Sequence, residues 1–151
     1  DLAVAADSAK FATPGVDIGL FCSTPMVALS RNVPRKQAMN MLLTGDAVTA
    51  QEAVHIGLIN RAVPAADLSN EAMALAQKIA AKPFTTIRTG KRAFYDQLEM
   101  TLEDAYRFAA QVMTQNMLHA EANEGICAFL EKREPNWIPS PHPLPKRERA
   151  L

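Results

Sequence analysis

Hydrophobic positions along the chain recur mainly with a helical period. Between residues 68 and 79, apolar side chains fall at helical spacing, and Glu71, Gln77 and Lys78 lie on the opposite face. This pattern predicts an amphipathic helix whose apolar stripe packs on a core. Unbroken apolar runs typical of buried strands are short and occur at residues 2–6, 10–12 and 58–63. The pattern therefore predicts a mainly helical chain with about three short strands.

Proline, glycine and capping residues mark the ends of the other helices. Pro34 suits the first turn of a helix that Gly45 can terminate. Thr49 and Glu52 fit a capping box and predict a two-turn helix over 49–56. Three more helices are predicted: one opening at Pro83, one capped by Thr101, and one over 120–132, interrupted or bent at Gly125 and ended by Pro135.

The predicted strands are too few to satisfy one another's backbone hydrogen-bonding groups. A buried strand needs neighbours for its backbone donors and acceptors, and three short strands make a poor sheet. We therefore expect Asp1 to lie inside a larger domain whose earlier strands precede it. At the other end, five of the ten prolines crowd into the last seventeen residues, with Lys146, Arg147 and Arg149 among them. This composition predicts a flexible basic tail over 135–151.

Charge and cysteine content narrow the class of partner. Sixteen basic residues balance sixteen acidic ones, which removes the electrostatic reason to expect nucleic acid or an anionic membrane as a partner. No apolar run approaches the ~20 residues of a spanning helix, and residues 1–10 show no targeting signal. Cys22 and Cys127 give neither a disulfide framework nor a CxxC motif. We therefore expect a soluble, cytoplasmic protein.

Several catalytic motifs are missing from the chain. It contains no GxSxG, P-loop, GxGxxG or HExxH motif, so hydrolase, nucleotide-binding and zinc-protease classes have no sequence support. The three histidines, His55, His119 and His142, are isolated from one another and from carboxylate clusters. We therefore expect no metal site.

Short motifs in a fixed order carry a family resemblance. They are DLAVAA at 1–6, FATPGVDIG at 11–19, LLTGD at 42–46, AVHIGL at 53–58 and EGICAFLEKR at 124–133. Over residues 1 to about 137, the chain resembles the C-terminal half of the crotonase (enoyl-CoA hydratase/isomerase) superfamily. Its pattern is most similar to enoyl-CoA hydratase domain-containing homologues that lack the second catalytic glutamate. The resemblance implies an α/β fold of ββα units arranged in a spiral, of which this would be the mainly helical half.

The resemblance also implies a domain organisation and an activity. Residues 1–64 would complete the crotonase core, 65–134 would form the helical trimerisation region, and 135–151 the tail. The family binds acyl-CoA thioesters in fatty acid metabolism, as homotrimers or hexamers, with coenzyme A as part of the substrate and no separate cofactor. Its oxyanion hole uses two backbone N–H groups, each typically worth ~10²–10³ in rate. Both would precede Asp1, so we expect the 151-residue chain alone to be inactive.

Gly15 occupies the position that matters most for catalysis. Matching Phe11-Ala12-Thr13-Pro14 to the family's Phe-x-x-Pro-Glu pattern places glycine where hydratases carry their second glutamate. Glycine cannot transfer protons, and general acid–base catalysis contributes typically 10²–10⁴-fold. Hydratase chemistry is therefore in doubt. The expected substrate-binding residues are Pro14, Gly15, Phe21 and Ser23.

Two nearby side chains are candidates for a replacement role. If the segment is extended, the side chain of Asp17 lies on the same side as position 15 and could approach the pocket. Asp17 also suits a turn before Ile18-Gly19. Ser23 falls where some dienoyl-CoA isomerase-like members carry a carboxylate, and its hydroxyl could line the pocket. It also suits a helix cap, with Pro25 in the first turn.

The CoA end of the site is expected near the last helix. Lys132 matches a family lysine that meets the phosphates of CoA, and Phe129, one helical turn earlier, would pack the adenine. The alternative is a solvated helix end with cations near its C-terminus. Two functions remain open: an acyl-CoA-processing enzyme, or a non-catalytic acyl-CoA-binding or regulatory homologue.

Overall fold

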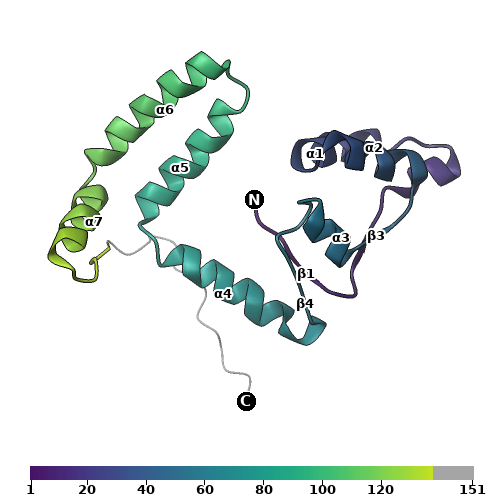
Figure 1. The fold of residues 1–151 in the computed structure, drawn as a ribbon, viewed down its shortest axis with the longest axis horizontal. Helices are drawn as coiled ribbons and strands as arrows, with labels where there is room; N and C mark the ends of the chain where they lie inside the picture. The colour runs from purple at the N-terminus through teal and green to yellow at the C-terminus, as the bar shows by residue number, and fades with distance from the viewer. Residues whose placement is uncertain (138–151) are drawn as a thin grey trace. The chain divides into compact units, whose positions relative to one another are not determined.

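The structure, a computed structural model, describes residues 1–137 of the chain (Figure 1). It divides into two compact units, the first covering Asp1–Leu75 and the second beginning at Ala76. The division falls inside helix α4 (Leu68–Ala80), whereas the predicted helical region, 65–134, contains the whole of this helix. From residue 138 on, the predicted tail lies outside the described residues.

The first unit contains four short strands in two separate pairs. Strands β1 (Val4–Ala6) and β4 (Arg61–Val63) pair in parallel, with Ala5 opposite Ala62. Strands β2 (Lys10–Phe11) and β3 (Val48–Thr49) pair antiparallel. The three predicted strands are present but shorter than predicted. Strand β3 was not predicted, because two residues cannot show a period. Strand β1 is half-buried rather than buried, since among the described residues it has one neighbouring strand.

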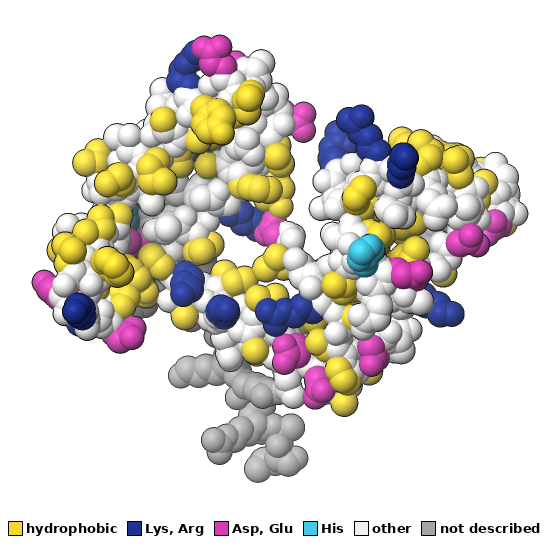
Figure 2. All heavy atoms as spheres, in the orientation of Figure 1, with side chains coloured by type: hydrophobic (Ala, Val, Ile, Leu, Met, Phe, Trp, Pro, Cys, Tyr) yellow, Lys and Arg dark blue, Asp and Glu magenta, His cyan; other side chains and the backbone are white. Residues whose placement is uncertain are grey.

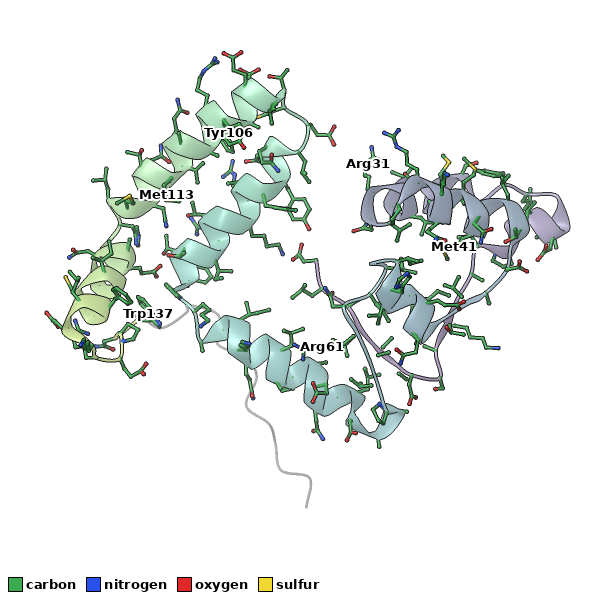
Figure 3. The ribbon with its side chains drawn as sticks, in the orientation of Figure 1. Arg31, Met41, Arg61, Tyr106, Met113 and Trp137 are labelled. Atoms are coloured by element: carbon green, nitrogen blue, oxygen red, sulfur yellow. The ribbon has the colours of Figure 1, made fainter. Side chains whose placement is uncertain are left out.

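Three α-helices of the first unit surround its core. They are α1 (Ser23–Asn32), α2 (Arg35–Thr44) and α3 (Ala50–His55), with one-turn 3₁₀ helices η1 (Pro14–Ile18) and η2 (Ala65–Asp67). One buried cluster consists of Leu29, Val33, Ala38, Met41 and Leu42; Figure 3 labels Met41 on α2. A second consists of Ala50, Ala53 and Ile59. Burial of the first cluster joins α1 to α2, and the second packs α3 against Ala5 of β1 and Ala62 of β4.

Local end signals behave as predicted. Gly45 ends α2 in the left-handed conformation, with φ of 72°. The capping box of α3 is complete: the Glu52 N–H donates to Thr49 Oγ1 at 3.2 Å, and the Thr49 N–H donates to Glu52 Oε2 at 2.7 Å. The Thr49 N–H and the Thr49 hydroxyl both donate to the Glu52 carboxylate, which lowers the pKa of Glu52. Pro34 lies at the N-cap of α2 rather than in its first turn.

The second unit is a helical assembly of α5 (Phe84–Gln97), α6 (Leu102–Met117) and α7 (Ala120–Glu131). Helices α5 and α6 form a hairpin, and Thr101 caps α6 through the Asp104 N–H at 3.3 Å, as predicted. Many large apolar side chains remain exposed on this unit, and Figure 2 shows such side chains in yellow. Tyr106 and Met113, labelled in Figure 3, are 73% and 60% exposed.

Two predictions about α7 were wrong. The helix runs through Gly125 without interruption, because its eleven other residues include no proline and sustain its hydrogen bonding. It ends at Lys132 in the left-handed conformation, before Pro135 is reached, so the proline does not cause the ending. No helix in the described part of the chain has the length and apolar character to cross a membrane.

Glu121 joins α7 to the start of α5. Its side chain is 4% exposed, and its carboxylate accepts hydrogen bonds from the backbone N–H groups of Thr85 and Thr86, at 3.3 and 3.1 Å. The first N–H groups of a helix have no partner within that helix and favour a negative charge. Glu121 therefore satisfies the N-terminus of α5 from a helix 35 residues away along the chain.

Candidate functional site

The segment around Gly15 forms a tight, closed turn. Helix η1 begins at Pro14, and Gly19 ends it in the left-handed conformation with φ of 78°. The chain then turns back, so that the Leu20 N–H donates to the Gly15 carbonyl at 2.8 Å. The Gly15 N–H donates to Cys22 Sγ at 3.3 Å. Both backbone polar groups of Gly15 are therefore engaged by the segment that follows η1.

This turn leaves no room for a side chain at position 15. A Cβ atom on Gly15 would lie 2.5 Å from the Leu20 carbonyl oxygen and 2.7 Å from Cys22 Sγ. Both distances are shorter than any normal contact of a Cβ atom, and the closer one involves backbone. Position 15 therefore lacks both the acid that hydratases carry and the space to hold it without moving the turn.

The same segment is anchored on α2. The Thr13 hydroxyl is buried and donates to the Met41 carbonyl at 2.9 Å. The carboxylate oxygens of Asp17 lie 3.0 and 3.1 Å from the position of a Cβ atom on Gly45, at the end of α2. Asp17 thus faces the turn after α2, in agreement with the structural alternative for this residue.

Ser23 is the first residue of α1, and its hydroxyl donates to the Phe21 carbonyl at 3.3 Å. The capping alternative for Ser23 was wrong: Cys22 is the N-cap, and no side chain caps this helix, because the Ser23 hydroxyl turns back to Phe21. Pro25 does lie in the first turn, as predicted. Phe21 is exposed.

A groove of about 480 Å³ opens in the first unit. Its walls include Phe11, Thr13, Pro25, Leu29 and Met41. The predicted substrate-binding residues Pro14, Gly15, Phe21 and Ser23 are not among the described residues that line it. They remain predictions: Pro14 and Gly15 follow Thr13 at the start of η1, and Ser23 begins α1, two residues before Pro25.

The predicted CoA-binding residues lie at the end of α7, in the second unit. Phe129 is 82% exposed and Lys132 is exposed. Lys132 has φ of 55° and ψ of 39° and is the C-cap of the helix. Its N–H and that of Arg133 close the helix end by donating to the carbonyls of Phe129 and Ala128, at 3.3 and 3.0 Å. Both side chains are thus available to a ligand in solvent.

Residues next to Lys132 form an ionic cluster. The Arg133 guanidinium donates to both carboxylate oxygens of Glu124, at 2.7 and 3.1 Å, and also to Glu131. The Asn136 N–H donates to Glu124 at 2.7 Å. Arg133 is the main reason that the pKa of Glu124 falls to about 2, and Glu124 in turn raises the pKa of Arg133. Among residues 1–137, no group of three His, Cys, Asp or Glu side chains is placed to hold a metal.

Comparisons with known proteins decide the family. The model of the enoyl-CoA hydratase/isomerase family matches residues 1–139. The chain belongs to the enoyl-CoA hydratase/isomerase family. It is 50% identical over 141 residues to the human enoyl-CoA hydratase domain-containing protein 3, mitochondrial, covering 93% of this chain and 46% of the relative. A putative enoyl-CoA hydratase from Thermus thermophilus is 37% identical, over 91% of this chain and 54% of the relative.

Solved crotonase structures resemble the fold of this chain. An enoyl-CoA hydratase from Mycobacterium smegmatis is 51% identical with a TM-score of 0.88, and covers 91% of this chain and 53% of that one. The human domain-containing protein 3 is 50% identical with a TM-score of 0.86, over 91% and 54%. The α/β fold class is confirmed. The chain spans about half the length of these relatives, and its placement in the C-terminal half stays a prediction.

The comparisons overturn the prediction of a cytoplasmic protein. The human, rat and mouse relatives are all named mitochondrial. The prediction rested on finding no targeting signal near Asp1, and the chain covers only 46% of each of these relatives. A targeting signal lies at the N-terminus of a whole protein, so the first residues of a chain that spans about half of its relatives do not report on one.

Sequence reasoning missed the residues that shape position 15. Cys22 and Leu20 approach Gly15 only because η1 and Gly19 reverse the chain, and no periodic pattern marks that reversal. Glu121 and Glu124 were also missed, since each carboxylate acts on backbone or side-chain groups at least nine residues away. The one available signal was Gly19, which favours a left-handed turn.

Proposed function

We propose that the protein carrying this chain binds acyl-CoA thioesters and acts on them without a carboxylate at position 15. The observation that carries the proposal is the occupied space at Gly15, where the Leu20 carbonyl and Cys22 Sγ take the place of a side chain. Membership of the enoyl-CoA hydratase/isomerase family supports acyl-CoA as the ligand. The protein would use family machinery for the thioester with an altered acid–base arrangement.

The reaction would depend on the oxyanion hole more than on proton transfer at position 15. Fixed N–H donors stabilise the negative charge on the thioester oxygen, both in an enolate and in the tetrahedral intermediate of thioester cleavage. Isomerisation, decarboxylation and thioester cleavage therefore remain accessible where one acid or none is needed. Hydration is disfavoured, because loss of one general acid–base group removes typically 10²–10⁴-fold of the rate.

The filled turn also favours a second candidate, a non-catalytic acyl-CoA-binding or regulatory homologue. The turn around Gly15 fills the space where a hydratase would hold its acid. A pocket that only binds its ligand needs no such acid. Asp17 and Ser23 provide no evident replacement, since Asp17 faces Gly45 and the Ser23 hydroxyl is engaged by the Phe21 carbonyl. In this alternative, the protein binds acyl-CoA but does not convert it to a product.

At the CoA end, we assign the phosphates to Lys132 and the adenine to Phe129. The exposed positions of both side chains support this assignment. Replacing Lys132 with alanine in the full-length protein should weaken CoA binding measured by calorimetry, because a charge-assisted hydrogen bond to phosphate is lost. Unchanged affinity would remove Lys132 from the site.

A trimer or a hexamer built from trimers is proposed as the working assembly, with the crotonase spiral completed by the other half of the protein. The large apolar side chains left exposed on α5, α6 and α7 support it, because contiguous exposed apolar surface is rare on monomers. Light scattering on the full-length protein tests this proposal: a monomer at micromolar concentration would contradict it.

The two functions separate in one experiment on the full-length protein. A panel of acyl-CoA thioesters, with crotonyl-CoA among them, is tested for binding by calorimetry and for turnover by product analysis. Turnover of any member supports the enzyme, and binding without turnover supports the binder. Absence of binding to CoA and to every thioester would refute both. Gly15→Glu is not a route to hydratase activity, since its side chain would meet the Leu20 carbonyl.

A further inference from the structure

Lys132 adopts a backbone conformation that lysine normally avoids. Its φ of 55° makes it the one non-glycine residue with positive φ in the described part of the chain. A residue with a Cβ atom is disfavoured in this region, and helices usually place glycine at such an ending. Strained residues persist where the surroundings over-determine them, and they cluster at ligand-binding sites. The surroundings of Lys132 are therefore informative.

A side-chain clamp fixes the chain directly after Lys132. Arg133, nine residues after Glu124 along the chain, binds both carboxylate oxygens of that residue and also Glu131. The same Glu124 carboxylate accepts the Asn136 N–H at 2.7 Å. Glu124 thus holds a side chain and a backbone group that follow Lys132, and it ties the chain after Lys132 back to α7.

Trp137 closes the clamp against α7. Its ring edge lies 3.0 Å from the position of a Cβ atom on Gly125, so the glycine provides the space for the ring (Figure 3). Glu124 and Gly125 are adjacent, and together they anchor Asn136 and Trp137. The first residues of the predicted tail are therefore held on the helix.

Within the clamp, the two neighbouring cations differ in what they can do. The Arg133 guanidinium is occupied by two carboxylates. The Lys132 ammonium has no ion pair with any residue in 1–137, and its side chain is exposed. An anionic ligand would therefore meet the ammonium of Lys132, while Arg133 serves the clamp.

We propose that Glu124 is a positioning residue that, through Arg133 and Asn136, holds Lys132 in the orientation that meets the phosphates of coenzyme A. The inference rests on the proposed function, since it assumes that Lys132 contacts CoA. It adds that the strained conformation of Lys132 is maintained for binding and that the carboxylate maintaining it never touches the ligand.

A double-mutant cycle on the full-length protein tests this role. Binding of CoA and of an acyl-pantetheine, which lacks the nucleotide phosphates, is measured by calorimetry for Glu124→Gln, Lys132→Gly and the double variant. Lys132→Gly keeps a residue suited to positive φ and removes the ammonium. Glu103→Gln is the matched control, because Glu103 pairs with Arg107 at 2.8 Å on α6, away from the clamp.

The expected result is a loss of CoA affinity confined to variants that affect Lys132. Lys132→Gly should weaken CoA binding by about 10- to 100-fold, the effect of one charge-assisted hydrogen bond. Glu124→Gln should weaken it by about 3- to 10-fold, a fraction of that interaction. It should have no further effect in the Lys132→Gly background, and acyl-pantetheine affinity should be unchanged in every variant.

Each contrary result has a distinct meaning. If Glu124→Gln lowers CoA affinity equally in both backgrounds, or lowers acyl-pantetheine affinity as much, then Glu124 has a general structural role and the proposal is wrong. If Lys132→Gly binds CoA normally, the positioning role fails while acyl-CoA binding stands. If the unsubstituted protein binds neither ligand, the proposed function itself fails and this inference with it.

Discussion

Replacing Gly15 with alanine should destabilise the first unit, although glycine-to-alanine changes often stabilise proteins. The new Cβ atom would lie 2.5 Å from the Leu20 carbonyl oxygen, so the turn after η1 must move by several tenths of an ångström or more. Movement would strain the Leu20 N–H bond to the Gly15 carbonyl, which closes the turn at 2.8 Å. The substitution therefore acts through a steric clash between the new Cβ atom and the backbone of Leu20.

The expected magnitude follows from two opposing terms. Overpacking of this kind costs typically 1–3 kcal/mol. Alanine also restricts the unfolded chain, which returns about 0.4–1 kcal/mol. The net prediction is a loss of about 1 to 2 kcal/mol in the free energy of unfolding. Adding Cys22→Ala should leave most of this loss, since it removes the contact at 2.7 Å and leaves the shorter one to Leu20.

Urea denaturation of the full-length protein, followed by circular dichroism, measures the effect. Gly90→Ala is the matched control: Gly90 lies inside α5, and a Cβ atom there would meet nothing within 4 Å. That variant should be more stable by about 0.5–1 kcal/mol, the helix propensity difference. A Gly15→Ala chain as stable as the unsubstituted one would refute the reasoning that position 15 has no room for a side chain.

Three further predictions concern single side chains of the second unit. Glu121→Ala should cost about 2 kcal/mol in urea denaturation, because it leaves half-buried N–H donors of α5 without a partner; a loss below about 0.5 kcal/mol would contradict this role. Lys132→Gly should raise stability by about 1 kcal/mol, since glycine has no penalty at positive φ, and an unchanged midpoint would argue against strain there. The stability contributed by Glu124 should vanish in acid: its pKa falls from 4.5 to about 2 on folding, so the contribution is present above pH 4.5 and is lost as the pH drops toward 2. The melting temperature difference between the unsubstituted chain and Glu124→Gln should therefore shrink below pH 4.5, and a difference independent of pH would rule out ionisation as its source.

Features that depend on a few residues close together in the chain were predictable from the sequence. The capping box of α3 depends on Thr49 and Glu52, three residues apart, and the ending of α2 depends on Gly45 alone. The family followed from motif order, and the absence of an acid at position 15 is visible in one residue. Strand β3 was not predictable, because two residues acquire strand geometry only through pairing with Lys10 and Phe11.

The sequence by itself determined the family, most helix boundaries and the absence of an acid at position 15, because these depend on residue identity and on hydrogen bonds within a few residues. Only the tertiary structure decided that the space beyond Gly15 is filled, since Leu20 and Cys22 reach it through a chain reversal. It also decided that Lys132 is held at positive φ, because Glu124 and Arg133 meet only when α7 ends and the chain folds back on it. Contacts across a reversed chain depend on three-dimensional geometry, which no residue pattern encodes locally.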